Sequence, residues 1–85
     1  MLKSPLTIIR EDKTYTRYEL GMILSISEAT VKRIEMGAAK IPEKCFAGLE
    51  KLGFDPAEVI KQQELFIADK VKQLLERGKP KKGHE

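Results

Sequence analysis

Residues 17–37 (RYELGMILSISEATVKRIEMG) constrain the fold of this chain most, because they are typical of two short helices joined by a three- or four-residue turn. Apolar residues stand wherever such a pair would face a shared core, namely at Leu20, Leu24, Ile26, Val31 and Ile34. A small residue, Gly21, stands where the two helices must cross closely. We expect space there for a methyl group and for nothing larger.

The remaining residues of the second helix fall together on its outer side. They are Ser27, Glu28, Ala29, Lys32 and Arg33. Two helices with a short turn and a polar outer face are the layout of a helix-turn-helix, whose second helix enters the DNA major groove. The pattern therefore predicts DNA binding, with the helix over residues 27–36 as the reading element.

Length and composition set the limits of this interpretation. A chain of 85 residues fits one small domain, which we expect over residues 1–77, followed by a basic disordered tail over 78–85. The net charge is only +3, so the arrangement of charges matters more than their sum. We expect a cytoplasmic protein, because no apolar run could span a bilayer and the first residues lack a signal-peptide pattern. The single Cys45 agrees with a reducing compartment.

Capping residues predict an all-α fold of five helices. Ser4 and Pro5 are suited to starting a helix over residues 4–12, although its apolar residues also fit a short strand. Thr16 and Glu19 form a capping box ahead of the second helix. The later helices are bounded by residues of the same kinds. A third helix, 27–36, lies between Ser27 and Gly37, and a fourth runs from Pro42 to about Leu52, before Gly53. The fifth, 57–77, follows Asp55 and Pro56.

The chain resembles the XRE-like helix-turn-helix family, which includes lambdoid phage repressors and Cro, over roughly residues 9–59. The resemblance lies in Arg10, Glu19-Leu20-Gly21, Leu24-Ser25-Ile26-Ser27, Val31-Lys32-Arg33-Ile34-Glu35, the Gly37…Lys40…Pro42 run and Leu52-Gly53-Phe54. It implies a five-helix lambda-repressor-like domain, here with an extended C-terminal helix. Three residues depart from the family pattern. Ser25 replaces a glycine in left-handed backbone at a cost of about 1 kcal/mol, Arg17 replaces a common glutamine, and Glu28 is acidic.

Four side chains on the second helix of the pair are candidates for base contacts. Arginine or lysine suits guanine, an acidic side chain accepts from cytosine N4, and a small apolar group meets the thymine methyl. Glu28, Ala29, Lys32 and Arg33 supply these chemistries. The alternative is an ordinary solvated surface in which Glu28 pairs with Lys32 one turn later.

The resemblance also implies contacts to phosphate and one structural ion pair. The phosphate candidates are Arg17, Ser27, Thr30, Lys40 and Lys44. Ser27 has a competing role as a helix cap, which we expect to be its main one. Arg10 and Glu35 often form an ion pair at the matching places in the family; the alternative is two independent surface charges.

Other chemistry finds little support in the sequence. One histidine, His84, and one cysteine, Cys45, do not assemble a zinc site or a Cys/His pair. The acidic residues are scattered among lysines, so paired-carboxylate catalysis has no support. We therefore predict a protein that is not an enzyme and that needs no metal or cofactor.

The long helix over residues 57–77 carries more apolar residues than one side of a small domain requires. We expect Phe66, Ile67, Val71 and Leu74 to stay exposed in a monomer and to form a homodimer, which would present two reading helices to two DNA half-sites. Alternatively, this half of the helix folds back on its own core.

The function that we predict is a transcriptional regulator, most simply a repressor of phage, plasmid or other mobile-element type. The alternative is an antitoxin-like or adaptor protein that binds a partner protein through the long helix and uses DNA binding for autoregulation. A third possibility is a module that has kept the fold and lost DNA binding.

Overall fold

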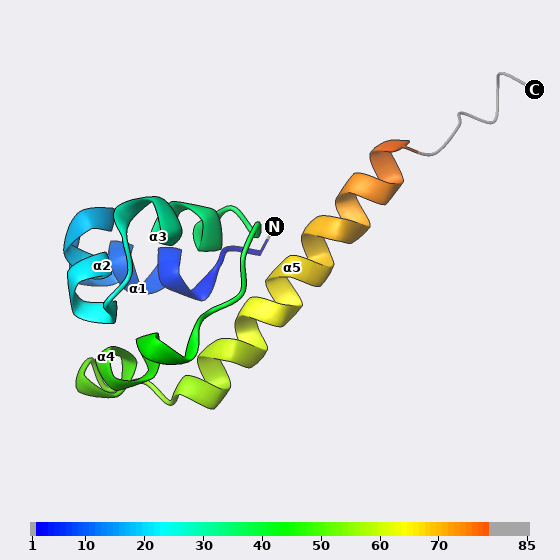
Figure 1. Ribbon diagram of the computed structural model, residues 1–85. Coiled ribbons are helices and arrows are strands. Elements are labelled where there is room, and N and C mark those ends of the chain that lie inside the picture. Colours follow the sequence, from blue (N-terminus) through cyan, green and yellow to red (C-terminus); the bar gives the residue numbers. More distant parts are fainter. Residues whose placement is uncertain (1, 79–85) are drawn as a thin grey trace, which may run out of the picture.

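The computed structural model describes residues 2–78, and every regular element in that range is helical (Figure 1). The α-helices are α1 (Pro5–Lys13), α2 (Arg17–Leu24), α3 (Glu28–Glu35), α4 (Phe46–Lys51) and α5 (Pro56–Gly78), and a 3-10 helix, η1 (Glu43–Cys45), precedes α4. The predicted all-α class with five helices is confirmed, and the alternative strand near the N-terminus is excluded. Gly78 ends α5 instead of starting a tail, and the rest of the predicted tail lies outside the described residues.

Local capping starts the first three helices as the sequence predicted. The Ser4 hydroxyl accepts a hydrogen bond from the Leu6 amide at 3.3 Å, with Pro5 at the first helical position. Thr16 and Glu19 form the reciprocal capping box. These side chains satisfy amides that have no partner within the helix, which is why each helix begins where it does.

The start of the fourth helix differs from the prediction. Pro42 does not lie in its first turn but precedes η1 with an extended backbone, at ψ 153°. The chain makes the 3-10 turn Glu43–Cys45 first, and the α-helix begins only at Phe46. It ends before Gly53, whose φ of 91° is a left-handed conformation that glycine adopts without strain.

A single apolar core lies between α1, α2, α3, α4 and the first half of α5. Its buried members are Leu6, Ile9, Leu20, Leu24, Val31, Ile34, Ile41, Cys45, Leu49 and Val59. Each fully buried leucine-sized side chain stabilises the fold by about 1.5–3 kcal/mol. Of the five residues expected to face this core from the helix pair, Ile26 is only partly buried.

The C-terminal half of α5 extends beyond this core instead of folding back on it (Figure 1). The molecule is therefore elongated, with extents of 55 × 22 × 21 Å. None of the helices within residues 2–78 is both long and apolar enough to cross a bilayer.

Candidate functional site

The connection between α2 and α3 is a tight turn over residues 25–27. Ser25 has the left-handed backbone that the family resemblance implies, with φ 63°, and the Ile26 amide donates to the Gly21 carbonyl at 2.9 Å. The expectation that Gly21 leaves space for a methyl group is wrong. A Cβ at this position would lie 2.6 Å from the Ile26 carbonyl oxygen, so even alanine forces the backbone to shift.

The helix α3 has one buried and one exposed side. Val31 and Ile34 are fully buried, and Glu28, Ala29, Lys32 and Arg33 are all exposed. These four exposed residues are called the α3 outer face below. The alternative ion pair between Glu28 and Lys32 is not among the salt bridges of the described residues.

The N-terminus of α3 is capped by its own side chains. The Ser27 hydroxyl accepts from the Thr30 amide at 3.1 Å, and the two hydroxyls lie 2.9 Å apart. Ser27 is thus a helix cap, as expected, and Thr30 supports it. Both phosphate candidates are already engaged in starting the helix.

The C-terminus of α3 is tied to two other helices through Glu35. Its carboxylate is 4% exposed and accepts from Arg10 Nε at 2.7 Å, and Arg10 Nη2 donates to its second oxygen at 3.2 Å. Arg17 Nε donates to the same carboxylate at 3.0 Å. These hydrogen bonds to a charged acceptor compensate the cost of burying it, and the bond to Glu35 raises the pKa of Arg10.

The Arg10–Glu35 pair of the sequence analysis is therefore present, whereas the participation of Arg17 was missed. Arg17 and Glu35 are 18 residues apart on different helices, and no local pattern connects them. The side chain of Arg17 is still 40% exposed. Since a guanidinium has five N–H donors, its bond to Glu35 leaves donors for another acceptor.

The remaining phosphate candidates lie beyond α3. Lys40 is exposed in the connection that follows α3, and Lys44 is exposed in η1. This connection begins at Gly37, whose φ of 80° ends the helix as predicted.

Of the four residues predicted to stay exposed and to pair two copies, Phe66 is buried, so this part of the prediction is wrong. The residue is 4% exposed, and its ring lies next to Gly37, where an added Cβ would be 3.3 Å from it. The Lys70 ammonium lies 5.8 Å from the ring centroid. Ile67 is partly buried, while Val71 and Leu74 are 48% and 58% exposed.

Gln63 is a positioning residue that no sequence pattern singled out. It is 2% exposed. Its amide nitrogen donates to the carbonyls of Ile34 at 2.9 Å and Ala39 at 3.0 Å, and its oxygen accepts from the Ser4 hydroxyl at 2.7 Å. This network joins α5 to the N-terminus, to the last turn of α3 and to the connection that follows α3.

Within residues 2–78, no cluster of three histidine, cysteine or acidic side chains could hold a metal ion. Burial raises the pKa of the Cys45 thiol, which disfavours the reactive thiolate. His84 lies outside the described residues.

Comparison with protein-family models, with curated proteins and with solved structures finds no significant match for this chain.

Proposed function

We propose that this chain is a sequence-specific double-stranded DNA-binding transcriptional regulator, most simply a repressor, that reads the major groove with α3. In this proposal α2, the turn after it and α3 form a helix-turn-helix of the XRE-like type. The observation that carries the proposal is the α3 outer face, because it combines exposure with a helix that is held in place along its other side.

The dimensions and chemistry of α3 suit this role. Eight residues make a helix of about 12 Å, which matches the width of the major groove. Lys32 and Arg33 supply donors for guanine, and Glu28 supplies an acceptor for the cytosine amino group. Ala29 is small enough to let the helix approach the bases and to contact a thymine methyl.

The rigidity of α3 also supports the proposal, since base readout requires side chains in a defined position. The Ser27 cap holds the first turn, and Glu35 holds the last turn to Arg10 and Arg17. Arg17, Lys40 and Lys44 then contribute positive charge for phosphate contacts, which position a protein without reading sequence.

The proposal is tested by selecting duplexes from a random DNA library with the purified protein and measuring the affinity of the best one at several salt concentrations. We expect a shared sequence among the selected duplexes and an affinity that falls with salt. Arg33→Ala should weaken binding to this duplex by about 1–3 kcal/mol and relax the preference at one base pair. Lys40→Ala should weaken binding to all duplexes similarly and lower the slope of affinity against salt concentration by about one unit.

Lys61→Ala is the matched control, because it removes an exposed lysine from α5 and should leave base preference unchanged. A change of base preference in Lys40→Ala but not in Arg33→Ala would reverse our assignment of reading and positioning. The absence of any salt-dependent binding to duplex DNA would overturn the proposal and favour a module that has lost this function.

A second function, binding of a partner protein through α5, is supported by a separate observation. Val71, Leu74 and Leu75 are 48–64% exposed on the part of α5 that projects from the core. In an antitoxin-like or adaptor protein, such a surface would hold the partner while α3 regulates the gene.

A further inference from the structure

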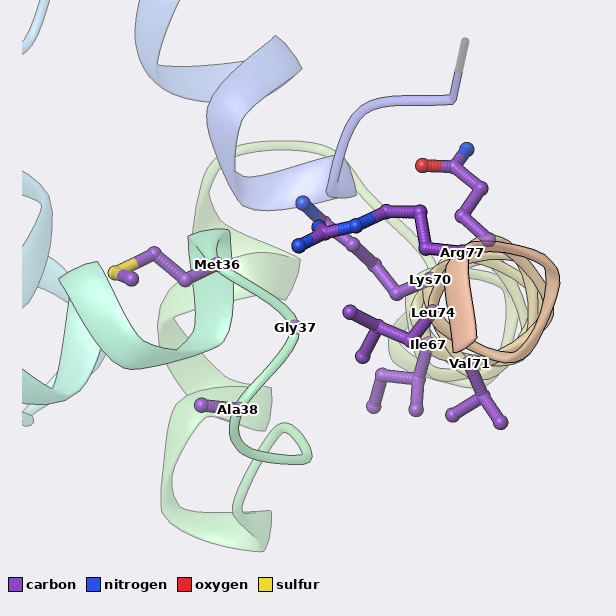
Figure 2. A pocket seen from close by; sticks show the side chains of 9 residues that line it. Met36, Gly37, Ala38, Ile67, Lys70, Val71, Leu74 and Arg77 are labelled. Carbon is purple, nitrogen blue, oxygen red and sulfur yellow. The ribbon is translucent and has the colours of Figure 1, made fainter. Parts of the chain in front are cut away.

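A groove of about 420 Å³ separates the projecting half of α5 from the connection that follows α3. Figure 2 looks along α5 and shows Ile67 and Leu74 pointing from this helix toward the segment around Gly37. Ala38 lies on the opposite wall. We call this feature the α5 groove.

The helix wall of the α5 groove is apolar and poorly covered. Val71 is 48% exposed and Leu74 is 58% exposed, whereas Phe66, which lies just before them, is 4% exposed. The side of α5 that begins in the core thus continues as an exposed apolar stripe. Exposed apolar surface of this kind marks an interaction site on a protein.

The edge of the α5 groove is positively charged. Lys70 and Arg77 line it, and no carboxylate is among its nine lining residues. In Figure 2 both cationic side chains extend from α5 toward the Gly37 segment. Helical spacing places the nearby acidic residues, Asp69 and Glu76, on the opposite side of α5 from Leu74.

We propose that the α5 groove binds an acidic amphipathic helix of another protein, with apolar side chains against the groove wall and carboxylates against Lys70 and Arg77. The lining residues from Ile67 to Arg77 span about 15 Å along α5, which accommodates about three turns of a partner helix. An amphipathic helix in an apolar groove is a common mode of peptide recognition.

A second copy of α5 fits this groove less well. In a two-fold pair the same surface patch of each copy meets the other. Two copies of Lys70 and Arg77 would then share one interface in which no carboxylate lines the groove. Such like-charge juxtaposition disfavours a complex, whereas an acidic partner turns the same charges into attraction.

The test is a selection of binders from a display library of random 16-residue peptides, with the full chain as target. We expect enriched peptides to carry a net negative charge and apolar residues spaced three and four apart. The charge-reversed variant Lys70→Glu/Arg77→Glu should instead enrich positively charged peptides. The best acidic peptide, made synthetically, should bind Leu74→Glu at least tenfold more weakly than the parent.

Leu65→Glu is the matched control, because Leu65 is 57% exposed and does not line the α5 groove. This variant should bind the peptide as the parent does. All four substituted positions are on the surface of α5, so we expect each variant to keep its fold. Melting curves of each variant check this and distinguish a lost contact from a lost fold.

The proposal is overturned if no peptide is enriched, if the enriched peptides show no acidic bias, or if Leu74→Glu enriches the same peptides. Sedimentation of the parent gives one further outcome. If the parent sediments as a dimer and Leu74→Glu sediments as a monomer, the groove is occupied by a second copy of the chain. That result would favour the homodimer predicted from the sequence. None of these outcomes depends on whether α3 binds DNA.

Discussion

Gly21 lies at the point where α2 comes closest to the turn before α3. A Cβ there would sit 2.6 Å from the Ile26 carbonyl oxygen, which is backbone and cannot rotate away. We therefore expect Gly21→Ala to lower the free energy of unfolding by about 1–3 kcal/mol, the usual cost of overpacking. Urea denaturation followed by circular dichroism measures it.

Gly78→Ala is the control for this substitution, because a Cβ at Gly78 would meet no atom within 4 Å. It should leave stability unchanged or raise it slightly. If Gly21→Ala unfolded at the same urea concentration as the parent, the turn would be more adaptable than its close approach implies.

Glu35 is the residue on which the position of α3 depends most. Its side chain is 4% exposed and bonds to Arg10 and Arg17. Glu35→Gln keeps the shape but removes the negative charge between two arginines. We expect a loss of about 1–3 kcal/mol of stability, less than the roughly 3–5 kcal/mol of a fully buried pair, because the Arg17 side chain is 40% exposed.

The matched control is Glu11→Gln, which breaks the Lys3–Glu11 pair. The side chains of that pair are 60% and 51% exposed, so water screens their interaction and we expect little change. Thermal melts of both variants provide the comparison. Equal melting temperatures for the two variants would contradict a structural role for Glu35.

At the scale of elements, α5 is attached to the rest of the domain by a buried polar contact as well as by apolar packing. Gln63 bonds to the carbonyl of Ile34, in α3, and to the carbonyl of Ala39, in the connection that follows α3. Gln63→Met keeps the volume and removes these bonds, together with that from Ser4. We expect a loss of about 1–3 kcal/mol, the cost of leaving buried polar groups without a partner.

Gln62→Met tests the same chemical change at the exposed neighbouring position, where it should be close to neutral. Hydrogen exchange adds a local measurement. The amides around Gly37 and Ala38 should exchange faster in Gln63→Met than in the parent, beyond what the change in global stability predicts. Uniform acceleration of all amides would instead indicate that Gln63 acts only through overall stability.

At the scale of the whole molecule, the shape is elongated, at 55 × 22 × 21 Å, because α5 extends beyond the apolar core. Val71, Leu74 and Leu75 remain 48–64% exposed, so the end of α5 contributes little burial to folding. We expect a chain that ends after Lys72 to keep its free energy of unfolding within about 1 kcal/mol of the parent. The shortened chain should lose the peptide binding proposed for the α5 groove.

Chemical denaturation of the shortened chain checks this expectation, and duplex binding checks whether α3 remains functional. A loss of several kcal/mol would show that the end of α5 closes onto the domain in solution. That result would support the alternative in which this half of the helix covers its own core.

The sequence by itself determined where α1 and α2 begin and the two sides of α3. These two helix starts follow from contacts between residues two or three positions apart, Ser4 with Leu6 and Thr16 with Glu19. The two sides of α3 follow from helical periodicity, which separates buried Val31 and Ile34 from the exposed outer face. These features could be predicted because each depends on neighbours within one turn.

Only the tertiary structure decided which residues meet across the chain. Periodicity puts Phe66 in the same apolar stripe as Leu74, yet the first is buried and the second exposed, because the core ends between them. Gln63 forms hydrogen bonds with residues that are 24 to 59 positions away in the sequence. Arg17 bonds to Glu35, which is 18 positions away. Such contacts depend on how helices cross and where the core stops, and no local pattern of residues records either.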